Sequence, residues 1–139
     1  MQLTPLIAVH MTAALGAVVV GPFALWARHG KTQRPRVHRA FGYAWVTLML
    51  VTATSALFIR DFSLPNLGGY TLLHALVPVT FFSLFGAFYY LSKGNIRGHR
   101  KTMQRLYISA CVVAGGFTLL PGRYLGQLVL GQWLGFEWV

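Results

Sequence analysis

Four histidines occupy repeated positions in a sequence that holds few other chemically active side chains. His10 and His74 lie inside long apolar segments, whereas His38 and His99 each begin the next apolar segment and are each followed by arginine. Neutral imidazole is a good ligand for haem iron, copper and zinc. Ionisable groups inside a membrane are costly and usually functional. The four histidines are therefore the candidate site.

The distances of these histidines from the basic loops predict two depths. His10 lies 18 residues before Arg28 and His74 lies 19 before Lys93, or roughly 27 and 29 Å along a helix. Both are expected near the outer edge of the hydrocarbon, and His38 and His99 near its inner edge. We expect His10 and His74 to bind haem b, or another metal ion, as axial ligands. His38 and His99 are candidates for a second centre.

Each pair also has a purely structural interpretation. His10 and His74 can hydrogen-bond to each other, to a backbone carbonyl or to a lipid headgroup. His38 and His99 stand beside arginine, where binding lipid phosphate is an ordinary role. Met103 follows His99 by one helical turn and can complete a His/Met ligand set, although methionine more often packs. Of the remaining candidates, His29 is expected to be solvated and Cys111 to be a small buried hydrophobe.

The composition indicates that these residues are positioned inside a membrane. Hydrophobic residues make up 55% of the 139 residues and charged residues 10%, whereas soluble domains average about 25% charged. Five of the twelve Lys and Arg residues fall within 28–39 and five within 93–105. Because these clusters interrupt long apolar runs, they favour loops beside a bilayer over a nucleic-acid surface.

The charge-free stretches are long enough for four membrane crossings. The positive-inside rule places both basic loops in the cytoplasm and both termini outside, since the 60–69 connection carries only Arg60, balanced by Asp61. Pro121 and Gly122 end the last crossing. The tail at 123–139 is predicted to be an interfacial segment or to dock a membrane-protein partner through its aromatic residues. The expected helices are 4–27, 38–59, 70–92 and 101–120.

The histidines also reveal an internal repeat. His10 corresponds to His74 and His38 to His99, at spacings of 28 and 25 residues. The two units, about 4–60 and 70–122, are parallel helical hairpins because each begins and ends outside. We expect Pro78 to disturb the third helix near His74, since proline removes an amide donor. The fold class predicted for the single domain 1–139 is an all-α, four-helix transmembrane bundle of two hairpin repeats with a short interfacial C-terminal segment.

The order of these motifs resembles a known family. The histidine of the first helix, His38-Arg39-x-x-Gly42, His74 and His99-Arg100-x-x-Met103 resemble a bacterial family of small predicted membrane proteins of unknown function. This resemblance implies a multi-pass protein of the bacterial inner membrane and supplies no activity. A broader architectural likeness is to the four-helix di-haem cytochromes b, although His38 and His99 lie closer to the membrane surface than buried axial ligands do.

The preferred hypothesis is a haem-binding, electron-transferring membrane protein. No hydrolytic or group-transfer constellation is visible, so the sequence leaves open whether the protein is an enzyme. One alternative is a non-catalytic accessory subunit or assembly factor of a larger membrane complex. Another is a small carrier for a metal ion or solute, which the lack of an acid within the expected helices disfavours.

Overall fold

The regular structure of the chain is almost entirely helical. The computed structural model describes residues 3–62, 65–120 and 123–135. The first half contains α1 (Pro5–Trp26) and α2 (Pro35–Ala56). In the second half, the 3-10 turn η1 (Leu72–Ala75) leads into α3 (Leu76–Ser92). After a short turn, α4 (Ile96–Leu106), the π-helix η2 (Tyr107–Val113) and α5 (Ala114–Thr118) form one continuous helical rod. A hairpin of β1 (Asn66–Leu67) and β2 (Tyr70–Thr71) joins the halves, and α6 (Tyr124–Gly126) with η3 (Gln127–Trp133) ends the described chain.

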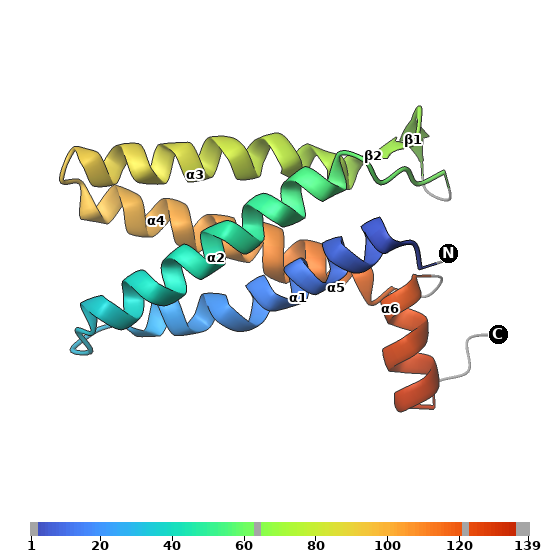
Figure 1. Cartoon of the computed structure of the whole chain (residues 1–139), viewed down its shortest axis with the longest axis horizontal. Coiled ribbons are helices and arrows are strands. Elements are labelled where there is room, and N and C mark those ends of the chain that lie inside the picture. Colours follow the sequence, from blue (N-terminus) through green and yellow to red (C-terminus); the bar gives the residue numbers. More distant parts are fainter. Residues whose placement is uncertain (1–2, 63–64, 121–122, 136–139) are drawn as a thin grey trace.

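The long helical segments lie side by side as two hairpins (Figure 1). One hairpin is formed by α1 and α2, and the other by α3 and the continuous rod from α4 to α5. Both tight helix–helix turns lie at one end of the molecule. The N-terminus, the β-hairpin and the tail lie at the opposite end, where α6 and η3 turn away from the bundle (Figure 1). We call these the basic end and the tail end.

Local sequence signals explain where the helices begin. The hydroxyl of Thr4 accepts a hydrogen bond from the first turn of α1, and proline is the first residue of both α1 and α2. The side chain of Asn95 accepts the amide of Gly98 at 2.8 Å and so caps α4. Such caps satisfy amides that have no partner within the helix. The preceding Gly94 has a φ of 71°, a conformation that glycine adopts readily.

A small buried core lies midway along the bundle. It contains Trp45, Met49, Leu84, Leu106 and Cys111 together with Ala17. Tyr107 approaches α1 so closely that a methyl group on Gly21 would lie 2.4 Å from its ring, and its hydroxyl donates to the carbonyl of Val18 at 3.0 Å. Glycine at this position therefore allows the rod to pack against α1.

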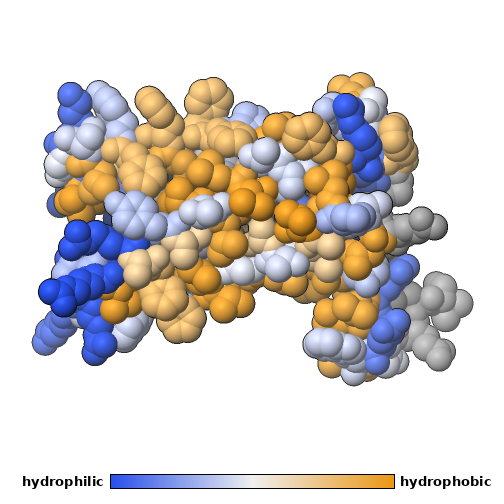
Figure 2. All heavy atoms as spheres, in the orientation of Figure 1, coloured by the Kyte–Doolittle hydropathy of each residue, from blue (hydrophilic) through white to orange (hydrophobic). Residues whose placement is uncertain are grey.

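The outer surface is apolar, as expected for a protein in lipid. Two helices, Pro5–Trp26 and Leu72–Ser92, are long and apolar enough to cross a membrane, and only 17% and 22% of their apolar windows are buried inside the protein. Large side chains such as Phe82 and Phe85 are exposed. On the face seen in Figure 2, a hydrophobic band crosses the middle and hydrophilic residues gather at both ends. The surface therefore resembles that of a membrane protein.

The expected helix positions agree with the structure in outline and differ at their ends. The first helix matches closely, while the second begins three residues earlier than expected because Pro35 starts it. The third segment begins at Leu72, since residues 70–71 pair in the β-hairpin. Pro78 falls in the first turn of α3, where its missing amide costs little, and the irregular turn precedes it. The described part of the tail, residues 123–135, is mostly helical. The expected break at residues 121–122 and the end of the tail lie outside the described residues.

Candidate functional site

Two cavities lie within the bundle, one on each side of the core. The inner cavity, near the basic end, has a volume of about 490 Å³ and is lined by His38 and His99. The outer cavity, near the tail end, has a volume of about 280 Å³ and is lined by His10 and His74. The four histidines identified in the sequence are thus placed in the two pairs that were expected.

The two histidines of the inner cavity make equivalent contacts. His38 Nδ1 lies 2.8 Å from the carbonyl oxygen of Ala24 in α1. His99 Nδ1 lies 2.9 Å from the carbonyl oxygen of Ala87 in α3. In each hairpin, therefore, the histidine that begins the second helix is held by the backbone of the first helix. Both side chains are half-buried.

These contacts determine which ring nitrogen remains available. A carbonyl oxygen can only accept, so Nδ1 must carry the proton in both rings. In the neutral ring Nε2 then keeps its lone pair, and among the described residues it has no hydrogen-bond partner in either histidine. Donation of the other ring N–H to a backbone carbonyl is also how metal-ligating histidines are usually oriented. His38 and His99 therefore each keep an Nε2 lone pair that no described residue uses.

The inner cavity also contains open space beside α2, a buried indole N–H and arginine side chains. A methyl group added to Gly42, one turn after His38, would meet nothing within 4 Å. The indole N–H of Trp45 is buried beside the cavity and has no hydrogen-bond partner in the described part of the chain. Arg28 and Arg100 line the cavity as well, and Arg100 donates to the carbonyl of Arg28 at 3.0 Å, which links the two basic loops.

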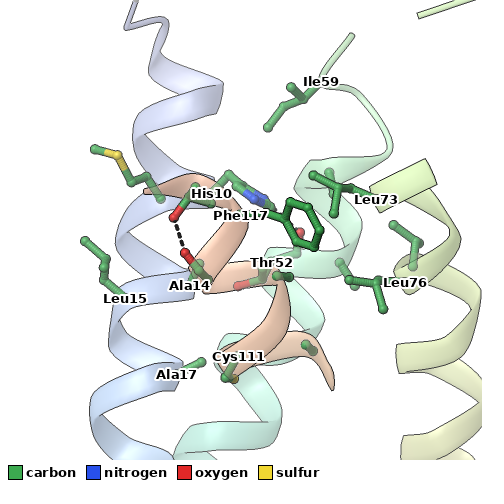
Figure 3. A pocket seen from close by; sticks show the side chains of 18 of the residues that line it. His10, Ala14, Leu15, Ala17, Thr52, Ile59, Leu73, Leu76, Cys111 and Phe117 are labelled. Atoms are coloured by element: carbon green, nitrogen blue, oxygen red, sulfur yellow. Dashed lines mark hydrogen bonds between the residues drawn. The ribbon is translucent and has the colours of Figure 1, made fainter. Parts of the chain in front are cut away.

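In the outer cavity, His10 resembles the inner histidines. Its Nδ1 lies 3.0 Å from the carbonyl oxygen of Thr52 and 3.0 Å from the hydroxyl of Ser55, both in α2. No described residue bonds to its Nε2. In Figure 3 the ring lies among apolar side chains, with Phe117 close by and Ile59 and Leu73 beyond.

His74 differs from the other three histidines because both of its nitrogens are occupied. Its Nδ1 accepts the backbone amide of Thr71 at 3.0 Å, and its Nε2 donates to the carbonyl oxygen of Ile59 at 2.8 Å. These bonds cap the η1 turn and attach it to the segment that follows α2. In this arrangement the one lone pair of the ring, on Nδ1, is already engaged, so His74 offers no nitrogen to a metal ion. The expectation of a His10/His74 ligand pair stays a prediction that would require the bonds of His74 to break.

An ion pair that the sequence did not predict lies beside the outer cavity. Asp61 and Arg123 both line it, and a guanidinium nitrogen of Arg123 lies 2.5 Å from a carboxylate oxygen of Asp61. The side chains are only 8% and 20% exposed, respectively. Arg60, which was paired with Asp61 in the charge balance, lies instead over the ring of Tyr70 at 3.9 Å. Because the chain has only two acidic residues, Asp61 could have been recognised as a residue in need of a cation. Its partner Arg123 lies 62 positions further along the chain, so no local pattern identifies it.

The remaining candidates have simpler roles. His29 is exposed at the rim of the inner cavity, and Met103 lines that cavity one turn after His99. Cys111 is buried in the core with its sulfur 3.9 Å from that of Met49. Within the described residues no group of three or more His, Cys, Asp or Glu side chains gathers as a metal site.

The helical fold and its apolar surface are those expected of a membrane protein, and the sequence comparison agrees. Residues 7–125 match the family of predicted membrane proteins designated DUF2306, a domain of unknown function, and the chain belongs to this family. No curated protein and no solved structure matches the sequence significantly. The match covers all four histidines and both cavities.

Proposed function

We propose that the protein binds haem b in the inner cavity and transfers electrons in the membrane, and that His38 and His99 would hold the haem iron. The observation that carries this proposal is the matched state of the two imidazoles. Each donates Nδ1–H to a backbone carbonyl, each leaves Nε2 without a partner in the described chain, and both line one cavity. Two imidazoles from facing helices are a common way to hold haem iron in electron-transfer proteins.

Other features of the inner cavity suit a porphyrin. Its volume of about 490 Å³ lies within the roughly 300–1,000 Å³ typical of ligand sites. The open space beside Gly42 allows a flat ring to approach α2. Arg28, Arg39 and Arg100 lie around the cavity, where their guanidinium groups can pair with two propionate carboxylates. The mixture of apolar walls, paired imidazoles and cationic groups therefore fits haem b better than a bare metal ion.

The chain's own residues would hold and tune the group rather than perform chemistry. Bound haem supplies one-electron transfer. The carbonyls of Ala24 and Ala87 fix the ring orientation and the tautomer of His38 and His99. The basic side chains raise the local positive potential, which favours the reduced state.

We further propose that the protein crosses the bacterial inner membrane four times, with the basic end in the cytoplasm. Support comes from the length of α2, whose 22 residues extend about 33 Å, and from the comparable rod of α4, η2 and α5. Both basic loops lie at one end of the apolar band (Figures 1 and 2). The positive-inside rule would then place that end in the cytoplasm and both chain ends outside.

The visible absorption spectrum of the purified full-length protein tests the haem proposal. We expect a Soret band with the α and β bands of a six-coordinate haem after reduction. His38→Ala and His99→Ala should each reduce haem content at least tenfold, because one axial ligand is lost. His29→Ala is the matched control, since His29 is exposed at the rim of the same cavity, and it should retain haem.

Two outcomes would contradict this assignment. A colourless, fully folded protein that takes up no haem when hemin is supplied would overturn haem binding and favour an accessory subunit. A haem protein that loses its Soret band in His10→Ala and His74→Ala, but not in His38→Ala, would move the site to the outer cavity.

A further inference from the structure

The outer cavity holds two polar groups that have no partner within the described chain. His10 Nε2 carries a free lone pair, because Nδ1 donates to the carbonyl of Thr52. Thr80, from α3, is only 3% exposed and lines the cavity, yet its hydroxyl makes no hydrogen bond to the described residues. Both groups line the cavity without a hydrogen bond to the described protein, so a polar ligand in the cavity can satisfy them.

The rest of the cavity limits the ligand to a neutral, mostly apolar molecule. Small and apolar side chains such as Ala14, Ala53 and Val77 form the walls, and Figure 3 shows Phe117 and Leu76 facing the same space. The two charged residues, Asp61 and Arg123, neutralise each other. The volume of about 280 Å³ accommodates a single substituted ring.

We propose that the outer cavity binds the headgroup of a lipid-soluble quinol. One phenolic O–H donates to Nε2 of His10, and the oxygen on the opposite side of the ring accepts from the hydroxyl of Thr80. A quinol satisfies both groups because its oxygens point away from opposite ends of a flat apolar ring, and His10 and Thr80 come from different helices. Its isoprenoid tail matches the lipid around the bundle.

The position of this cavity would give the quinol a role beside the haem. His10 lies 14 residues before Ala24, whose carbonyl holds His38, so the two sites are separated by roughly 21 Å along α1. The core that contains Met49 and Cys111 lies between them. A role for the quinol as an electron donor rests on the proposed haem function, whereas quinol binding does not depend on it.

Equilibrium binding of a short-chain ubiquinol to the full chain in lipid nanodiscs tests the proposal, with empty nanodiscs as the blank. We expect saturable binding that is at least tenfold weaker for the dimethyl ether of the same quinol, because the ether has no O–H to donate. Thr80→Val, which replaces the hydroxyl with a methyl of similar size, should weaken quinol binding several-fold. Equal affinities for the quinol and its ether would overturn the proposal.

A matched pair of glycine variants tests the location. Gly115 lines the outer cavity while Gly116 is exposed and does not, and an added methyl would meet nothing within 4 Å at either position. Gly115→Leu should reduce quinol affinity at least tenfold, and Gly116→Leu should leave it within twofold. Equal effects of the two substitutions would place the quinol in the surrounding lipid instead.

The same measurement separates this proposal from the haem assignment. We expect the His38→Ala, His99→Ala double variant to lose haem and to keep its quinol affinity. Wild-type protein that binds quinol but takes up no haem would overturn only the proposed function. A haem protein whose quinol binding is insensitive to Gly115→Leu would overturn only the outer site.

Discussion

The two cavities contain the same residue type and use it differently. At the basic end, His38 and His99 are in the same state, each held through Nδ1 by the neighbouring helix. At the tail end, His10 leaves one nitrogen free and His74 leaves none. The comparison shows that the hydrogen bonds of a histidine ring decide whether a lone pair remains for another partner.

The largest expected effect comes from filling the inner cavity. Gly42→Leu places a bulky side chain in space that no protein atom occupies, so it should lower haem content at least tenfold while the protein stays folded. Gly86→Leu is the control, since Gly86 is also free of contacts within 4 Å and lines neither cavity. Absorbance per mole of protein measures the difference. Full haem content in Gly42→Leu would show that haem lies elsewhere.

The ion pair at the outer cavity should be the next most sensitive feature. Asp61→Asn leaves the guanidinium of Arg123 without its carboxylate in a site where both are mostly buried, and we expect a loss of about 3 kcal/mol of stability. Thermal unfolding followed by circular dichroism in detergent measures it. The control is Arg34→Gln, which removes only a surface cation–π contact 5.3 Å from Trp26 and should change stability by less than about 1 kcal/mol. An equally small effect of Asp61→Asn would mean that water screens the pair.

His74→Ala distinguishes a structural histidine from a ligand. It removes the hydrogen bonds of the ring to the amide and hydroxyl of Thr71 and to the carbonyl of Ile59, and should cost about 2 kcal/mol at roughly 1 kcal/mol for each ring nitrogen. Haem content should not change. If His74→Ala instead abolished the Soret band without lowering the unfolding temperature, the ligand pair expected from the sequence would be correct.

Met103→Leu should have the smallest effect. The substitution conserves apolar volume and should change stability by less than about 1.5 kcal/mol. Because His38 and His99 already supply two nitrogen ligands in the proposed site, the reduced spectrum should be the same as that of the wild type. A shift of the bands in Met103→Leu would identify Met103 as the ligand in place of His38.

The sequence predicted the positions of the histidines better than their roles. The positions of the two basic loops and the lengths of the apolar segments between them were enough to place His38 and His99 at one end of the bundle and His10 and His74 at the other. The role of His74 depends on a 3-10 turn and on the end of α2, so no local pattern reveals it. The pairing of Asp61 with Arg123 likewise depends on how the two halves pack. The hydrogen bonds of His74 and the Asp61–Arg123 ion pair are important because they are partly buried, and burial arises only when the bundle has assembled.

The π-helix η2 has a geometric consequence for the rod that contains it. His99, Met103, Tyr107, Cys111 and Gly115 follow one another at intervals of four residues, and each lines one of the two cavities. In an α-helix each such step overshoots a full turn by about 40°, so the row would wind away from the interior. The wider turn of η2, which spans Tyr107–Val113, makes each step fall short instead. The opposite drifts offset each other, and one row of side chains faces inward along the whole thickness of the bundle.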